Sequence, residues 1–124
     1  MHTIYVYGTL RPGLKPTVTL KGEMRNLGWF PGVKLDENSG YTFQTEPIVV
    51  DDKSLETLDR YEGYHKNNPS ASLYIRKSIE IDGKPAWIYE YNQEFYDDHH
   101  PLVESGDWLT ATASPKGRAH NMGV

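Results

Sequence analysis

Two runs of strand-forming residues flank the dipeptide Asp82-Gly83, and no other feature of the sequence constrains the fold as strongly. The runs, residues 73–81 and 85–91, are rich in β-branched and aromatic side chains, which favour strands. Asp-Gly is a preferred pair for a two-residue hairpin turn. The sequence therefore predicts an antiparallel hairpin with Ile81 opposite Lys84.

This register places Arg76 opposite Tyr89 and assigns the side chains of the hairpin to two faces. One face is aliphatic and is predicted to join the core: Ile75, Ile79, Ile81, Ala86 and Ile88. The other face carries aromatic rings and a cation: Tyr74, Arg76, Trp87, Tyr89 and Tyr91. Because such a face is unusual in contact with bulk water, we expect it to form the wall of a polar cavity.

Further strands are predicted from short β-branched or aromatic runs that end near Gly or Pro. They are residues 3–7, residues 28–35 with a bend at Pro31-Gly32, residues 40–45 and residues 47–50.

One helix is predicted, because apolar residues recur with helical spacing at Leu55, Leu58 and Tyr61. Asp51-Asp52 or Ser54 can cap its start, and Gly63 can end it. A polar loop at 64–72 follows. A late element can form around Leu102, Val103, Trp108 and Leu109. Short strands with one helix indicate an α+β or mostly-β domain, with a small closed barrel among the possibilities.

The chain has 124 residues, enough for one domain, which we place at 1–113 with a flexible tail at 114–124. Hydrophobic residues make up only 37% of the sequence, but 9 Tyr, 3 Trp and 3 Phe can each bury a large area. A disordered chain would be poor in such residues. We therefore expect a folded domain with many tyrosines in or near its core.

Charge and composition exclude several classes of protein. The net charge of -4 lacks the basic excess of a nucleic-acid binder. The sequence has no Cys, which excludes disulfides and thiol catalysis. No stretch approaches the ~20 apolar residues that span a bilayer, and the start resembles no signal peptide. We expect a cytoplasmic protein without nucleic-acid or membrane partners, and favour a monomer.

The segment Tyr7-Gly8-Thr9-Leu10-Arg11-Pro12-Gly13 follows the first predicted strand. Its glycines allow a tight turn with backbone N–H groups open to a ligand. A phosphate loop is excluded, because Leu14 stands where Lys is needed and Pro16 disrupts the following helix. The pattern also fits a plain loop at the end of a strand. Taken alone, the pattern favours this plain loop over a ligand-binding one.

Glu62 falls in the last turn of the predicted helix, beside Tyr61, Tyr64 and His65. The helix dipole disfavours a negative charge there, and burial would raise the pKa of the carboxyl toward neutrality. Such a pKa suits a general acid–base. The alternative is a solvated Glu at a helix end, which the residue type alone favours.

Arg76 could clamp a substrate carboxylate or orient Glu62, and its alternative is a structural ion pair. The five His share no metal-ligand spacing, so we predict no metal site. The sequence also lacks the Gly-x-Ser-x-Gly motif of a serine nucleophile.

In chain order, five segments resemble the gamma-glutamylcyclotransferase-like family, including its AIG2-like and gamma-glutamylamine cyclotransferase branches. Residues 6–13 are similar to the family's Tyr-Gly-Ser/Thr-Leu loop. Residues 58–63 (Leu-Asp-Arg-Tyr-Glu-Gly) are similar to its segment with the acid–base Glu, and residues 74–79 to its Tyr-x-Arg strand. Residues 86–91 are similar to the partner strand, and residues 105–108 (Ser-Gly-Asp-Trp) to a late family motif.

The resemblance covers residues 3–109 and departs from the family at residues 67–70, which look inserted. It implies a small mixed β-barrel with one or two helices and a cavity at its mouth. It also implies a cofactor-independent enzyme that cyclises a small γ-glutamyl amide or amine and releases 5-oxoproline and the free amine.

The resemblance assigns roles to residues of this chain. Glu62 would be the acid–base group. The substrate-binding residues would be Tyr7, Gly8, Thr9 and Leu10, through their backbone, with Arg76 and Tyr89 lining the cavity. Two alternatives stay open: a non-catalytic ligand-binding or regulatory module on the same fold, and an interaction domain with exposed Tyr and Trp.

Overall fold

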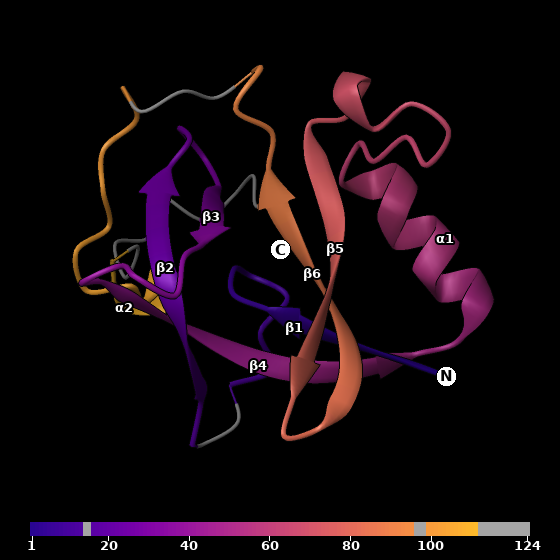
Figure 1. The fold of residues 1–124 in the computed structure, drawn as a ribbon, viewed down its shortest axis with the longest axis horizontal. Helices are drawn as coiled ribbons and strands as arrows, with labels where there is room; N and C mark the ends of the chain where they lie inside the picture. Colours follow the sequence, from indigo (N-terminus) through magenta and orange to yellow (C-terminus); the bar gives the residue numbers. More distant parts are fainter. Residues whose placement is uncertain (14–15, 96–98, 112–124) are drawn as a thin grey trace.

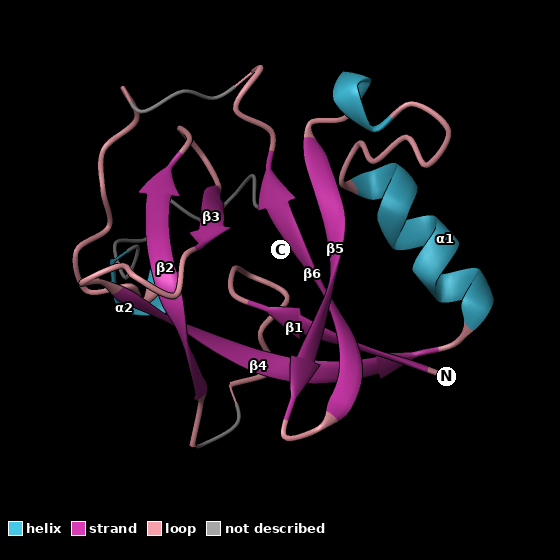
Figure 2. Ribbon diagram, viewed as in Figure 1, coloured by secondary structure: helices cyan, strands magenta, loops and turns pink. Residues whose placement is uncertain are grey.

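The computed structural model describes residues 1–13, 16–95 and 99–111, and within them six strands form one curled sheet (Figures 1 and 2). The domain boundary predicted at residue 113 and the tail predicted at 114–124 lie outside the described residues.

The sheet is a half-barrel with the strand order β3-β2-β4-β1-β6-β5. All neighbouring strands are antiparallel except β1 and β6, which are parallel. This confirms the predicted α+β class and the mixed, barrel-like sheet. The elements are β1 (His2–Val6), β2 (Val18–Asn26), β3 (Pro31–Leu35), β4 (Thr42–Val50), α1 (Asp52–Tyr61), the short 3-10 helix η1 (Pro69–Ala71), β5 (Tyr74–Ile81), β6 (Lys84–Tyr91) and α2 (Trp108–Ala111).

The predicted hairpin is confirmed with its register: Ile81 pairs with Lys84, and Arg76 pairs with Tyr89. Asp82 and Gly83 have φ values of 52° and 77°, the positive values that a tight hairpin turn needs. Both faces of the hairpin contribute buried side chains, however, with Ala86 and Ile88 on the aliphatic face. The expected cavity wall is mostly core, since its three tyrosines are buried: Tyr74, Tyr89 and Tyr91.

The sequence predicted no strand at β2, and this was wrong. Only Gly22 and Met24 of its nine residues are buried, so polar side chains hide the strand pattern. The strand predicted at 28–35 begins later, at Pro31. A turn precedes it, in which the Leu27 N–H donates to the Phe30 carbonyl at 2.9 Å.

The two strands predicted on either side of Glu46 are one continuous strand, β4. Its first half pairs with β2 up to Thr45, and its second half pairs with β1 from Glu46 onward. Pro47 follows the last pair with β2, so its missing N–H removes no hydrogen bond to that strand.

The predicted helix is confirmed as α1. The Asp51 carboxylate caps it by accepting from the Ser54 N–H at 2.8 Å, and Gly63 ends it with a φ of +69°. The predicted late element packs against β2, where the Val103 N–H donates to the Met24 carbonyl at 2.7 Å. α2 follows with Trp108 buried. No helix in the described part of the chain is long and apolar enough to cross a membrane.

β3 is one edge of the sheet and curls back toward the β5–β6 hairpin. Side chains join them, as the Tyr74 hydroxyl donates to the Pro31 carbonyl and the Glu90 carboxylate accepts from the Leu35 N–H at 2.8 Å. Gly32 packs so tightly that an added Cβ would lie 2.8 Å from the Cβ of Tyr91. Side chains therefore join β3 to the hairpin across the open side of the half-barrel.

Candidate active site

Glu62 follows the last residue of α1, and its N–H donates to the Leu58 carbonyl at 2.8 Å. The residue is only 1% exposed, and neither carboxyl oxygen has a hydrogen-bond partner among the described residues. Burial raises the pKa of Glu62 to about 9. The carboxyl is therefore protonated at neutral pH, because an unpaired carboxylate is costly in a buried site. The solvated alternative for Glu62 is wrong.

Tyr7 lies directly after β1 and is fully buried. Its hydroxyl donates to the Tyr89 carbonyl at 2.5 Å. Burial raises the pKa of the Tyr7 phenol well above its usual value, and the nearby carboxyls of Glu62 and Glu90 raise it further. The phenol is therefore a neutral hydroxyl close to Glu62.

The loop after Tyr7 turns tightly, with the Arg11 N–H donating to the Gly8 carbonyl at 3.2 Å. Gly8 is buried and Thr9 is half-buried, while Leu10 is exposed. Leu10 lies beside the helix that ends at Glu62, because it lines a surface hollow together with Thr57 and Leu58 of α1. The end of the loop therefore lies next to α1.

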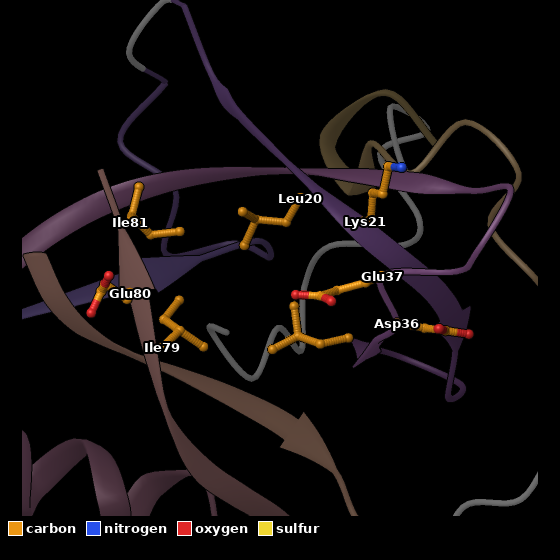
Figure 3. A pocket seen from close by; sticks show the side chains of 8 residues that line it. Leu20, Lys21, Asp36, Glu37, Ile79, Glu80 and Ile81 are labelled. Atoms are coloured by element: carbon orange, nitrogen blue, oxygen red, sulfur yellow. The ribbon is translucent and has the colours of Figure 1, made fainter. Parts of the chain in front are cut away.

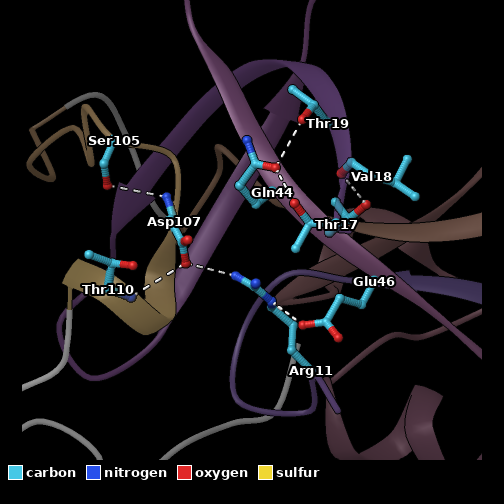
Figure 4. Close-up of polar contacts among 10 residues, drawn as sticks. Arg11, Thr17, Val18, Thr19, Gln44, Glu46, Ser105, Asp107 and Thr110 are labelled. Atoms are coloured by element: carbon cyan, nitrogen blue, oxygen red, sulfur yellow. Dashed lines mark hydrogen bonds and ion pairs between the residues drawn. The ribbon is translucent and has the colours of Figure 1, made fainter. Parts of the chain in front are cut away.

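Arg11 fixes this loop from inside the protein (Figure 4). Its Nε lies 2.6 Å from the Glu46 carboxylate, and its Nη1 lies 2.8 Å from the Asp107 carboxylate. Partial burial raises the pKa of Asp107, but the hydrogen bond from Arg11 lowers it. The pKa of Asp107 therefore lies below its usual value. Sequence reasoning missed this triad, because its members come from three distant segments.

A second cluster lies one helical turn before Glu62. The Tyr89 hydroxyl donates to Asp59 at 2.7 Å, and the Arg76 guanidinium lies 3.3 Å from the other oxygen of Asp59. Arg76 also stacks over Trp87 and Tyr64, with centroid distances of 4.3 and 5.4 Å. Burial and the bond to Asp59 raise the pKa of the Tyr89 hydroxyl.

The structure thus places Tyr7 and Tyr89 near Glu62, and it places Leu10 in a surface hollow shared with α1. Arg76 pairs with Asp59 rather than with Glu62. This contact is the structural ion pair that the sequence left open as an alternative. Sequence reasoning gave Asp59 no role, although it belongs to the Leu-Asp-Arg-Tyr-Glu-Gly motif. Among the described residues, no three His, Asp or Glu side chains gather closely enough to hold a metal ion.

Comparison with known proteins places this site in a family context. Residues 4–110 match the family described as "Gamma-glutamyl cyclotransferase, AIG2-like". The chain is 30% identical over 120 residues to a Vibrio cholerae protein named "Putative gamma-glutamylcyclotransferase", and the match covers 86% of this chain and 95% of the relative.

Solved structures agree on the fold. The protein ytfP of Escherichia coli is similar with a TM-score of 0.64 and 26% identity, over 88% of this chain and 97% of that one. The protein PH0828 of Pyrococcus horikoshii has a TM-score of 0.63 at 18% identity, over 97% of this chain and 100% of that one.

Proposed function

Because the chain belongs to the gamma-glutamyl cyclotransferase, AIG2-like family, we propose that it cyclises small γ-glutamyl amides or amines without a cofactor. The products are 5-oxoproline and the free amine. The observation that carries this proposal is Glu62, a buried carboxyl without a hydrogen-bond partner among the described residues. Such a group is costly to the fold, which supports a functional role for it.

In the proposed reaction, the α-amine of the substrate attacks the γ-carbonyl carbon of the same molecule. A new C–N bond closes the five-membered ring as the bond to the leaving amine breaks, so no water is consumed. Because nucleophile and electrophile belong to one molecule, the enzyme mainly has to hold them in an attacking geometry.

Glu62 supplies the proton transfers in this proposal. The carboxylate takes a proton from the substrate's α-ammonium, and the resulting acid gives this proton to the leaving amine. The ring nitrogen then loses its second proton to the Glu62 carboxylate, which passes it to the released amine and is ionised again. An ammonium group is also the partner that the buried carboxyl lacks, so substrate binding would stabilise the ionised form.

The loop after β1 would bind the glutamyl part of the substrate. Backbone N–H groups of Tyr7, Gly8, Thr9 and Leu10 would hold its carboxylate or polarise the γ-carbonyl. Arg76 and Tyr89 would shape the cavity by fixing Asp59, one turn before Glu62. Their contacts with Asp59 support this role.

The proposal is tested with γ-glutamyl amines, γ-glutamyl amino acids and a γ-glutamylated aminoglycoside side chain, with 5-oxoproline measured by chromatography. We expect product from at least one class. Saturable binding of these compounds without any product would instead identify a ligand-binding module, and neither binding nor product would exclude both functions.

A further inference from the structure

The late motif at residues 105–108 (Ser-Gly-Asp-Trp) has no part in the reaction proposed above, and the structure fixes it firmly against β4. The Gly106 carbonyl accepts from the Gln44 N–H at 2.8 Å. Gly106 has a φ of +67°, and an added Cβ there would clash with the carbonyl oxygen of Thr42. The segment therefore holds the next residue, Asp107, in a defined place beside the sheet.

Asp107 reaches from this segment to the loop after β1 (Figure 4). Its carboxylate lies 2.8 Å from Nη1 of Arg11, and Nε of Arg11 lies 2.6 Å from the Glu46 carboxylate. The Arg11 side chain is only 1% exposed, so two carboxylates hold its guanidinium inside the protein. Glu46 pairs with Val6, the last residue of β1, and this anchor therefore lies close to the start of the loop.

The backbone of Arg11 closes the loop that its side chain anchors. The Arg11 N–H donates to the Gly8 carbonyl at 3.2 Å, which forms a turn with Thr9 and Leu10 at its centre. The N–H groups of this turn are among those that bind the glutamyl part of the substrate in the proposed function. Moving the guanidinium therefore moves the turn, and a displacement of about 1 Å can cost an enzyme as much as ~100-fold.

Asp107 lies outside two hollows that are large enough for a small molecule. The hollow beside the loop is lined by Leu10, Thr57 and Leu58, among others, and not by Asp107. The hollow of about 510 Å³ between β2, β3 and β5, shown in Figure 3, is lined by neither Asp107 nor Arg11. The route from Asp107 to a substrate at the loop therefore runs through Arg11.

We propose that Asp107 is a positioning residue, which holds the Arg11 guanidinium against Glu46 and thereby fixes the turn at residues 8–10 in its substrate-binding geometry. The late motif thus acts on the substrate through the loop. This inference rests on the proposed function, which assigns substrate binding to the turn. Because the Glu62 carboxyl makes no hydrogen bond to the triad, the proton transfers assigned to Glu62 are not affected.

Two substitutions separate the contact of Asp107 with Arg11 from its other contact, in which the carboxylate accepts from the Thr110 N–H at 3.4 Å in α2. Asp107→Asn keeps an oxygen that can reach both partners. Asp107→Ser can still cap α2, since Ser is a good N-cap residue, but its side chain is too short to reach Arg11. Glu104→Gln, which changes an exposed side chain of the same segment, is the matched control.

The test measures kcat/KM from pH 6 to 9 with a γ-glutamyl substrate that the wild type converts. We expect Asp107→Ser to lower kcat/KM about tenfold, with Asp107→Asn and Glu104→Gln within about twofold of the wild type. The pH at which kcat/KM peaks should not change. In ¹⁵N NMR spectra, which also show whether each variant is folded, the amide signals of Gly8, Thr9 and Leu10 should move in Asp107→Ser and stay in place in Asp107→Asn.

Several results would overturn this inference and leave the proposed function standing. They are a folded Asp107→Ser variant with wild-type kcat/KM, an equal loss in Asp107→Asn, and a displaced pH peak, which would mean that Asp107 acts on Glu62. An unfolded Asp107→Ser variant would also overturn it, because Asp107 would then serve stability alone. Absence of product from the wild type would overturn the proposed function and this inference together.

Discussion

Asp59 and Glu62 lie one helical turn apart at the end of α1, yet among the described residues only Asp59 has partners for its carboxylate. Asp59 accepts the Tyr89 hydroxyl at 2.7 Å and pairs with Arg76, whereas Glu62 is buried alone. The two neighbouring carboxyl groups therefore lie in different surroundings. Asp59 is fixed in place by these contacts, whereas burial raises the pKa of the Glu62 carboxyl.

The first prediction concerns stability. The pKa of Glu62 rises from 4.5 to about 9 on folding, so the native state binds a proton that the unfolded state releases between these values. The free energy of unfolding of the wild type therefore falls relative to Glu62→Gln as pH rises, by about 1.4 kcal/mol per pH unit. Urea unfolding of both proteins at pH 5.5, 7 and 8.5 measures the difference.

Glu62→Gln is a matched reference for the wild type, because the amide keeps the shape of the protonated carboxyl but does not titrate. The two proteins should have similar stability near pH 4.5 and differ most near pH 9. A difference that stays constant across this range would show that the carboxyl titrates normally.

The second prediction concerns the pH dependence of the reaction. In the proposed reaction, the productive complex holds one proton between Glu62 and the substrate's α-amine, whose pKa is about 8. Since Glu62 in the free enzyme has a pKa of about 9, kcat/KM should rise from pH 6 to 8 and peak between 8 and 9. A plateau from pH 6 to 8, with a fall only below pH 5, would mean that Glu62 is ionised in the free enzyme.

The third prediction concerns the buried triad. Arg11→Met removes the cation that lies 2.6 Å from the Glu46 carboxylate, whose side chain is fully buried, so it should cost about 3–5 kcal/mol of stability. Asp107→Asn is the control, since Asp107 is 23% exposed and the amide can still accept from Arg11. That change should cost about 1 kcal/mol or less. Equal losses in urea unfolding would contradict a buried ion pair at Glu46.

The fourth prediction concerns the seam between β3 and β6. Glu90→Ala leaves the Leu35 N–H without its acceptor and should cost about 1–3 kcal/mol. Glu90→Gln keeps an oxygen acceptor and should cost less. Amide hydrogen exchange at Leu35 should accelerate in Glu90→Ala only. Unchanged exchange in both variants would mean that Glu90 does not hold the seam.

Short-range sequence patterns predicted the hairpin and the helix, whose bounds are set by a turn and by caps. The Asp82-Gly83 turn gave the hairpin register, and the Asp51 cap and Gly63 gave the bounds of α1. β2 was missed because most of its side chains are polar, so its place depends on pairing with β3 and β4 rather than on its own pattern.

The site was predicted only in part for a similar reason. The position of Glu62 at a helix end beside aromatic residues left open a buried carboxyl with a raised pKa and a solvated one, and the burial of Glu62 decides for the first. The partners of Asp59, Arg11 and Glu90 could not be predicted, because each pairs with a segment far away in the sequence. These contacts form only in the folded chain, where the curled sheet brings distant segments together.

The central claim is that Glu62 transfers protons in a cyclotransferase, and one measurement tests it directly. Wild type and Glu62→Gln are incubated at pH 8 with a γ-glutamyl substrate that the wild type converts, and 5-oxoproline is measured over time. We predict that the Gln variant stays folded and loses at least about 100-fold in rate, the usual contribution of a general acid–base group. A folded Glu62→Gln variant that forms 5-oxoproline at the wild-type rate would contradict the account.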